Sequence, residues 1–267
     1  VSEIPISRPG DVWIMGQHRL LCGDSTVAES YDHLMQGAVA DMVFTDPPYN
    51  VNYANSAKDK MRGKDRAILN DNLGDGFYDF LLAALTPTVA HCRGGIYVAM
   101  SSSELDVLQA AFRAAGGKWS TFIIWAKNTF TLGRADCQRQ YESILYGWKD
   151  GSQHYWCGAR DQGDVWFVDK PRVNDLHPTM KPVELIERAI TNSSKNRDIV
   201  LDLFGGSGTT LIAAERTGRS ARLMELDAKY VDVIVQRWQD YTGNKAVLDG
   251  EDLTFDVIKG SRNSKAA

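Results

Sequence analysis

The run Asp46-Pro47-Pro48-Tyr49-Asn50 combines a carboxylate, two prolines and an aromatic ring. Each proline fixes its own φ angle and lacks an N–H group, so the run is stiff. An ionised carboxylate only accepts hydrogen bonds, and the carbonyl of Pro47 is a second acceptor. Two fixed acceptors can hold both N–H groups of one exocyclic amine while Tyr49 stacks on the ring that carries it. The run therefore predicts an amine-binding site, although a rigid turn that closes a strand would use the same residues.

A second run, Val200–Thr210, passes from an apolar strand into a glycine-rich turn and then into a helix. Glycine suits a turn where the backbone must approach a ligand closely. The run lacks the lysine of a P-loop and the full G-x-G-x-x-G spacing. Glu225 closes the next apolar run about 20 residues on, where nucleotide-binding folds hold a ribose hydroxyl. Together these features favour an adenosine-type cofactor over a purely structural turn.

With these residues in view, the sequence resembles the amino-methylating DNA methyltransferases. Asp46–Asn50 matches their DPPY catalytic motif, and Val200–Thr210 resembles their FxGxG loop for S-adenosyl-L-methionine. His177–Leu185 resembles the HPTxKP segment that precedes this loop, and Cys22–Ser25 resembles the N-terminal GDS element. The order of these motifs is that of the β group, a circular permutation of the class I methyltransferase fold. The resemblance covers about residues 11–242.

The resemblance implies a site and a cofactor, S-adenosyl-L-methionine. No metal is expected, because the four cysteines are widely spaced, without a C-x-x-C pair or paired histidines. The catalytic positions would be Asp46, Pro47, Pro48 and Tyr49. The cofactor-binding positions would be Asp24, Asp46, Thr179, Lys181, Asp202, Phe204, Gly205, Gly206, Ser207, Gly208, Thr209 and Glu225. Among them, Asp24 would lie near the adenine of the cofactor, and Thr179 and Lys181 near its methionine moiety, whose carboxylate a lysine can pair.

The chemistry expected of this site follows from the weakness of an exocyclic amine as a nucleophile. Its lone pair is delocalised into the base, and fixed acceptors would stabilise the positive charge that develops on the nitrogen. Alignment of the amine with the methyl donor supplies proximity. Because a base inside a duplex cannot reach such a site, the target nucleotide must flip out.

The target atom is open between two exocyclic amines. No cysteine follows a proline, so methylation of cytosine carbon 5 through a thiolate is not expected. By resemblance, aspartate at the first motif position is typical of adenine-N6 enzymes, which leaves cytosine N4 as the alternative. RNA methylation and an inactive nucleic-acid-binding subunit are further alternatives. A nicotinamide-binding protein would leave Asp46–Asn50 unexplained.

Two segments are candidates for contact with double-stranded DNA. The first is the polar segment 51–72, a predicted DNA-contacting loop with five basic residues, Lys58, Lys60, Arg62, Lys64 and Arg66, which a solvated loop would also tolerate. The second, residues 150–176, occupies the family's target-recognition position and carries Arg160 and Arg172 among aromatic side chains. Those aromatic residues could instead form a small core under the segment.

Short apolar runs alternate with amphipathic stretches, which predicts a Rossmann-like α/β fold with helices on both faces of a mostly parallel sheet. By resemblance the sheet would have seven strands, in a single catalytic domain over 1–267. The predicted strands are Arg19–Cys22, Asp41–Thr45, Gly95–Met100, Ser120–Ala126, Ser143–Trp148, Ile199–Leu203 and Ala221–Glu225. The predicted helices are Ala28–Gln36, Tyr78–His91, Glu104–Ala115, Pro182–Ser194, Thr209–Thr217 and Ala228–Tyr241.

Composition adds broader expectations. With 267 residues, 43% hydrophobic and 24% charged, the chain suits a globular α/β domain rather than a disordered or fibrous protein. The net charge of −4 argues against a nonspecific nucleic-acid binder. The charge is unevenly spread, however, because Lys58–Arg66 carries a net +3 and Asp227–Asp256 a net −4. No apolar run suits a signal peptide or a membrane helix, so a cytoplasmic protein is expected. By resemblance, a homodimer and a cognate restriction endonuclease are candidate partners.

Overall fold

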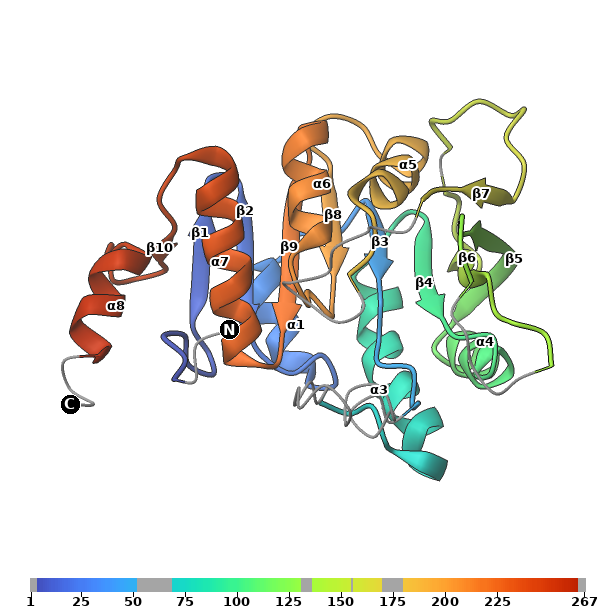
Figure 1. Ribbon diagram of the computed structural model, residues 1–267, viewed down its shortest axis with the longest axis horizontal. Coiled ribbons are helices and arrows are strands. Elements are labelled where there is room, and N and C mark those ends of the chain that lie inside the picture. The colour runs from blue at the N-terminus through green and yellow to red at the C-terminus, as the bar shows by residue number, and fades with distance from the viewer. Residues whose placement is uncertain (1–3, 52–68, 131–135, 155, 170–179, 264–267) are drawn as a thin grey trace.

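One mixed β-sheet with helices on both faces organises the chain (Figure 1). The structure is a computed structural model that describes residues 4–51, 69–130, 136–154, 156–169 and 180–263. The strands run in the order β10-β1-β2-β9-β8-β3-β4-β6-β5-β7. They are β1 (Val12–Met15), β2 (His18–Cys22), β3 (Met42–Thr45), β4 (Ile96–Met100), β5 (Gly117–Ala126), β6 (Tyr141–Lys149), β7 (Val165–Phe167), β8 (Ile199–Asp202), β9 (Ser220–Glu225) and β10 (Val247–Leu248).

Helices cover the sheet in two groups, and each group packs on its own hydrophobic core. The first core lies under α5 to α8 and the second under α1, α3 and α4. The helices are α1 (Ala28–Met35), the short 3-10 turn η2 (Gly74–Gly76), α3 (Phe77–Ala90), α4 (Leu105–Ala114), α5 (Val183–Ser193), α6 (Thr209–Thr217), α7 (Ala228–Thr242) and α8 (Phe255–Asn263).

Helix α7 shows how the sequence produces these layers. Val231, Ile234, Val235 and Trp238 recur at the spacing of one helical face, and all four are buried. Asp227 caps the first turn by accepting a hydrogen bond from the backbone N–H of Lys229, and Gly243 ends the helix in a left-handed conformation. Strands β3 and β4 are buried at every position, as central parallel strands are.

The predicted fold class is confirmed, and the expected seven strands are corrected to ten among the residues that the structure describes. Five of the nine neighbouring strand pairs are parallel and four are antiparallel. The strands that the sequence reading did not predict are β1, β7 and β10. The last two have three and two residues, too few to show a period of two. All six predicted helices are present within one or two residues of the predicted ends, and α8 is additional.

One edge of the sheet collects the candidate site residues. Strands β2, β9, β8, β3 and β4 are parallel neighbours, so their carboxyl ends meet at that edge. Strand β6 runs antiparallel to β4, so β6 begins there and ends at the opposite edge. The residues just after β3 and β8, and just before β6, are therefore brought together although they are far apart in the sequence. Ligands of open α/β sheets bind at this edge.

Candidate active site at the carboxyl edge of the sheet

The centre of the site is the carboxylate of Asp46, directly after β3. The hydroxyl of Tyr49 donates to Asp46 Oδ1 at 2.7 Å, and Lys181 Nζ donates to Asp46 Oδ2 at 2.6 Å. Glu142 joins them from β6, with its Oε2 3.1 Å from the Tyr49 hydroxyl and 3.2 Å from Lys181 Nζ. The Lys181 side chain is only 4% exposed. Two carboxylates thus share one buried ammonium group.

Burial and these contacts together set the ionisation of the cluster. Burial raises the pKa of Asp46 above its ordinary value, and the neighbouring Lys181 works against that shift. Burial would lower the pKa of Lys181, but Asp46 and Glu142 outweigh it and raise that pKa. Burial likewise opposes ionisation of Glu142, yet Lys181 and Lys127 bring its pKa down to about 2. The cluster therefore holds a protonated lysine beside an ionised Glu142, and the same lysine offsets part of the burial that raises the pKa of Asp46.

The backbone of the Asp46–Asn50 run is fixed by residues just before α3. Asp71 Oδ1 accepts hydrogen bonds from the backbone N–H of Tyr49 at 3.1 Å and of Val51 at 3.3 Å. Asn50 has a left-handed φ of 57°, and its Oδ1 accepts from the N–H groups of Leu73 and Gly74. Asparagine adopts this conformation more readily than most residues. The motif is therefore tied at its second half, which fixes where the Tyr49 ring lies.

The glycine-rich turn between β8 and α6 is the second part of the site. Gly206 and Gly208 both have left-handed φ angles, 53° and 77°. A Cβ on Gly208 would lie 2.9 Å from Ile234 Cγ2, so the turn presses directly on α7. The side chains of Ser207 and Thr209 lie close together, with 3.3 Å between their hydroxyl oxygens.

Two carboxylates, the buried Asp202 and the partly buried Glu225, lie at the base of this turn. Glu225 Oε2 accepts from the backbone N–H of Gly206 at 2.7 Å. Asp202 Oδ1 accepts from the Thr45 hydroxyl at 2.9 Å, which ties the turn to the residue just before Asp46. Burial raises the pKa of each carboxyl to about 7.

Asp24 and Phe204 complete the set that the structure brings to this edge. The backbone N–H of Gly23 bonds to the carbonyl of Glu225 at 3.0 Å, which places Asp24 next to the end of β9. The Asp24 carboxylate accepts from the N–H and hydroxyl of Thr26. The ring of Phe204 packs against that of Phe80, with 5.9 Å between centroids.

Several predicted residues are not part of this assembly. Thr179, Arg172 and the cations Lys58, Lys60, Arg62, Lys64 and Arg66 lie outside the described residues. Arg160 is exposed and lies at the opposite edge of the sheet. There the backbone N–H of Cys157 bonds to the carbonyl of Asn192, near the carboxyl end of α5, whereas Lys181 precedes the amino end of that helix. The structure therefore does not bring Arg160 to Asp46.

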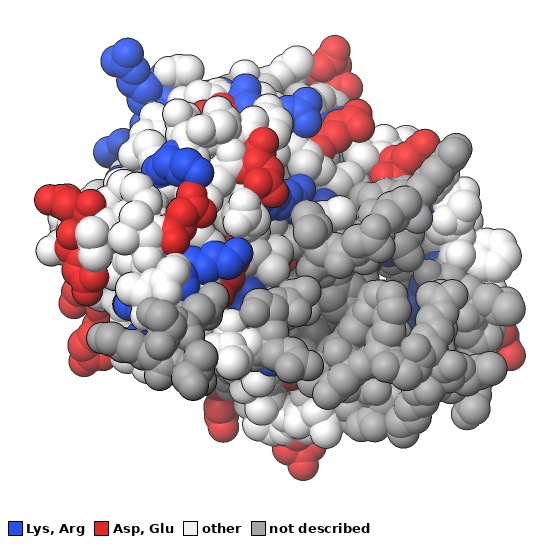
Figure 2. Space-filling model, turned by 60° about the vertical axis from the view of Figure 1, so that its left-hand side comes forward, with Lys and Arg blue, Asp and Glu red and all other residues white. Residues whose placement is uncertain are grey.

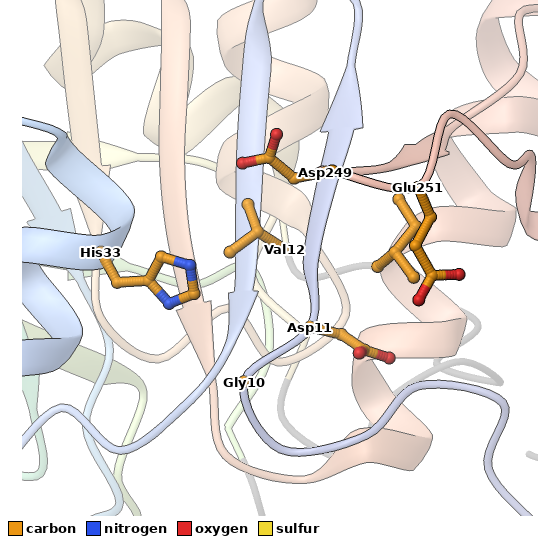
Figure 3. A pocket seen from close by; sticks show the side chains of 8 residues that line it. Gly10, Asp11, Val12, His33, Asp249 and Glu251 are labelled. Carbon is orange, nitrogen blue, oxygen red and sulfur yellow. The ribbon is translucent and has the colours of Figure 1, made fainter.

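A separate hollow of about 310 Å³ lies beside β1 and β10 (Figure 3). It is lined by Gly10, Asp11, Val12, His33, Leu248, Asp249, Gly250 and Glu251. It contains none of the candidate site residues. Asp11 pairs with Arg262 and Asp249 with Arg19, so two of its carboxylates are already neutralised. Within the described ranges, no cluster of three or more His, Cys, Asp or Glu residues could hold a metal ion, and no helix is long and apolar enough to cross a membrane.

Comparison with known protein families adds independent evidence. The model of a family described as DNA methylase, the N6/N4 methyltransferases, matches residues 40–236. The match includes Asp46, Glu142, Lys181 and the glycine-rich turn. The protein belongs to the N6/N4 DNA methylase family.

Two curated relatives share between a quarter and a third of their aligned residues with this chain. The type II methyltransferase M2.LlaDCHI of Lactococcus lactis subsp. cremoris is 29% identical over 224 residues, which cover 74% of this chain and 81% of that protein. The DNA adenine methyltransferase YhdJ of Escherichia coli (strain K12) is 26% identical over 235 residues, which cover 74% of this chain and 75% of that protein.

Solved structures show the same class I methyltransferase fold. The crystal structure of the M1.HpyAVI–SAM complex superposes with a TM-score of 0.63 at 20% identity, and covers 82% of this chain and 97% of that one. The PvuII DNA methyltransferase, which is cytosine-N4-specific, superposes with a TM-score of 0.64 at 17% identity, over 97% of this chain and 94% of that one. The proteins similar to this chain thus include one described as a DNA adenine methyltransferase and one, alike in fold, described as cytosine-N4-specific.

Two residues of the site, Glu142 and Asp71, were missed by sequence reasoning. Glu142 precedes the predicted strand Ser143–Trp148 by one residue, and Asp71 falls within the polar segment 51–72. A lone acidic residue at a strand end carries no spacing signal, because its partners come from three other segments of the chain.

Proposed function

We propose that this DNA methyltransferase transfers the methyl group of S-adenosyl-L-methionine to the N6 amine of a flipped-out adenine. The observation that carries the proposal is the Asp46 carboxyl group, held by hydrogen bonds from Tyr49 and Lys181 and next to the glycine-rich turn. Aspartate at the first position of the motif, which by resemblance is typical of adenine enzymes, favours adenine. Cytosine N4 is the second candidate, since a cytosine-N4-specific relative shares the fold.

The residues at the carboxyl edge fit the proposed cofactor. Glu225 and Asp24 lie side by side at the ends of β9 and β2, where a ribose and an adenine would be held. The left-handed φ angles of Gly206 and Gly208 shape the turn 205–208, and the lack of a Cβ at Gly208 lets the turn pack on Ile234 of α7. When bound, the cofactor supplies an electrophilic methyl group. In this proposal Phe204–Thr209, Asp202 and Glu225 bind it, and Thr179 and Lys181 lie towards its methionine end. The Lys181 ammonium already holds Asp46, Tyr49 and Glu142, so its part is to position Asp46 rather than to pair the cofactor carboxylate.

The chain's own residues would then act on the target amine. An ionised carboxylate offers about four acceptor positions, and Tyr49 and Lys181 use two of those on Asp46. The remaining positions, with the carbonyl of Pro47, can accept both N–H groups of the amine. These acceptors stabilise positive charge on the nitrogen as it forms its new bond. Pro47 and Pro48 keep the acceptors in place, and the Tyr49 ring stacks on the base.

An exposed aromatic row extends this edge and supports a nucleic-acid surface. Tyr141 on β6 and Phe167 on β7 flank Ala126 on β5, and they are 41% and 80% exposed. Phe130, in the segment after β5, is 56% exposed. Adjacent strands lie about 4.8 Å apart, so Phe167 lies four strands, roughly 19 Å, from β3. Aromatic rings of this kind can stack on unpaired bases.

The distribution of basic and acidic side chains points to the DNA-facing surface less directly than the aromatic residues do. The five cations between Lys58 and Arg66 follow the catalytic run in sequence, so contact with phosphates there remains a proposal. On the face towards α7 and α8, basic and acidic side chains are interspersed among the described residues (Figure 2). A type II methyltransferase is among the relatives, which supports a cognate restriction endonuclease as a partner, and the resemblance of the sequence adds a homodimer.

The test is methyl transfer to unmethylated genomic DNA, followed by digestion to nucleosides and mass spectrometry. N6-methyladenine is expected, whereas N4-methylcytosine would replace the adenine assignment by the second candidate. A product on RNA alone, or none, would refute the proposal. Asp46→Ala should lower kcat by about 10²–10³-fold, the usual effect of removing one group that stabilises transition-state charge. Asp46→Ala should still bind the cofactor by calorimetry, and the exposed Asp79→Asn serves as the control.

A further inference from the structure

The buried ammonium of Lys181 is fully engaged by the site itself. Its acceptors are Asp46 Oδ2 at 2.6 Å, the Tyr49 hydroxyl at 2.9 Å and Glu142 Oε2 at 3.2 Å. An ammonium group has three hydrogens, so each acceptor can take one. Because the Tyr49 oxygen accepts from Lys181, the tyrosine hydrogen is free to donate to Asp46 Oδ1, its closer carboxylate contact. Lys181 therefore acts on both oxygens of Asp46, directly on one and through Tyr49 on the other.

Glu142 is the counter-charge of this arrangement. Glu142 is the second residue of β6, and its carboxylate pairs both with Lys181 and with Lys127, which follows β5. The four charges of Asp46, Glu142, Lys127 and Lys181 sum to zero. Asp202, bonded to Thr45, is a further carboxyl of the site, and Asp46 contributes to raising its pKa. Glu142 therefore shares the charge of Lys181 with Asp46 instead of leaving Asp46 as its only anion.

We propose that Lys181 and Glu142 are a pair of positioning residues that set the acceptor strength of Asp46. Lys181 keeps the Asp46 carboxylate ionised in a buried site, and Glu142 withdraws part of the lysine's charge so that Asp46 remains a strong hydrogen-bond acceptor. This inference rests on the proposed function, in which Asp46 must accept hydrogen bonds from an amine. A buried ion pair that served stability alone would not tune one particular carboxylate in this way.

The proposal predicts opposite effects of two substitutions on one titration. Lys181→Met removes the cation, so Asp46 should ionise at a higher pH. Glu142→Gln removes the competing anion and keeps an acceptor for Lys181, so Asp46 should ionise at a lower pH. The double variant should lie between them, and Lys181→Arg, which keeps the charge, should stay close to the parent protein. The exposed Glu184, three residues from Lys181, provides the matched control Glu184→Gln, with no shift.

The experiment is a carbon-13 NMR titration of aspartate carboxyls, in which Asp46→Asn assigns the signal. A shift of one pH unit is a tenfold change in the ionisation constant, and at least that is expected for Lys181→Met. Opposite shifts support the proposal. Shifts in the same direction, or none in either variant, overturn it. The titration needs no DNA or cofactor, so it decides this inference even if the parent protein fails to methylate DNA.

Turnover provides the second readout. At neutral pH both variants should lose at least tenfold in kcat. Raising the pH should restore the kcat of Lys181→Met, because Asp46 then ionises without the lysine. It should not restore the kcat of Glu142→Gln, in which Asp46 is already ionised but is a weaker hydrogen-bond acceptor. Equal recovery of both variants, or of neither, would mean that the cluster only holds the fold together.

Discussion

Gly208 provides a quantitative test of how the glycine-rich turn is built. It caps the amino end of α6 with φ 77° and ψ 28°, and an added Cβ would lie 2.9 Å from Ile234 Cγ2. Gly208→Ala therefore carries two separate costs. The left-handed conformation costs an L-residue about 1–2 kcal/mol. Forcing a methyl group into a packed interior typically costs about 1–3 kcal/mol more. The free energy of unfolding should fall by about 2–5 kcal/mol.

Gly37 separates the two costs. Its φ of 79° is nearly the same, but nothing lies within 4 Å of its added Cβ. Gly37→Ala should therefore lose only about 1–2 kcal/mol. The difference between the two variants measures the contact with Ile234. Because Gly208 lies in the proposed cofactor loop and Gly37 does not, only Gly208→Ala should weaken binding of S-adenosyl-L-methionine.

The assay is equilibrium unfolding in urea with the slopes compared, together with calorimetry of cofactor binding. In the double variant Gly208→Ala/Ile234→Ala the clash disappears, so its loss should be smaller than the sum of the two single losses. Equal destabilisation by Gly208→Ala and Gly37→Ala, with additive behaviour in the double variant, would refute the argument that packing against α7 sets the shape of the turn.

Three further predictions concern pH and salt. Burial raises the pKa of Glu225 to about 7 from an ordinary 4.5, so the folded carboxyl keeps a proton that the unfolded chain releases. Stability should therefore fall by up to about 3 kcal/mol as the pH rises between these values, and Glu225→Gln should flatten that fall in urea titrations at pH 5 and pH 8. Burial lowers the pKa of His18, whose Nδ1 accepts from the N–H of Ala221 at 2.8 Å. The contribution of neutral His18 to stability is present above its ordinary pKa of 6.5 and is lost as the pH falls below that value. His18→Ala should cost about 1–3 kcal/mol at pH 8, because the backbone N–H of Ala221 loses its acceptor. Neutralising Lys58, Lys60, Arg62, Lys64 and Arg66 should lower the salt slope of DNA binding by up to about 4–5 units, and an unchanged slope would mean that these side chains are merely solvated.

The sequence predicts the two halves of the site because each half is a contiguous run. Asp46–Asn50 and the glycine-rich turn carry their chemistry in neighbouring residues, and both follow buried strands of a parallel sheet. The adjacency of Asp24 and Glu225 also follows from the permuted strand order, and the pairing of β2 with β9 confirms it.

What the sequence cannot show is which charges meet across the sheet. Glu142 reaches Lys181 only because β6 runs antiparallel to β4, and nothing at Glu142 itself indicates that direction. The same reversal separates Arg160 from the site, because the chain leaves β6 at the opposite edge and returns through β7. The strand β7 is three residues long, too short to predict from a pattern of alternation.

The order of strands has a consequence for how the protein is made. Strands β8 and β9 lie between β2 and β3, and they join the two ends of the sheet into one. Arg19 of β2 pairs with Arg222 of β9, so the early strands emerge from the ribosome long before their partners. At about 5–20 residues per second this wait is roughly 10–40 s. Throughout it the newly made β2 and β3 each expose one edge whose partner strand is still missing, and unpaired edges of this kind favour aggregation.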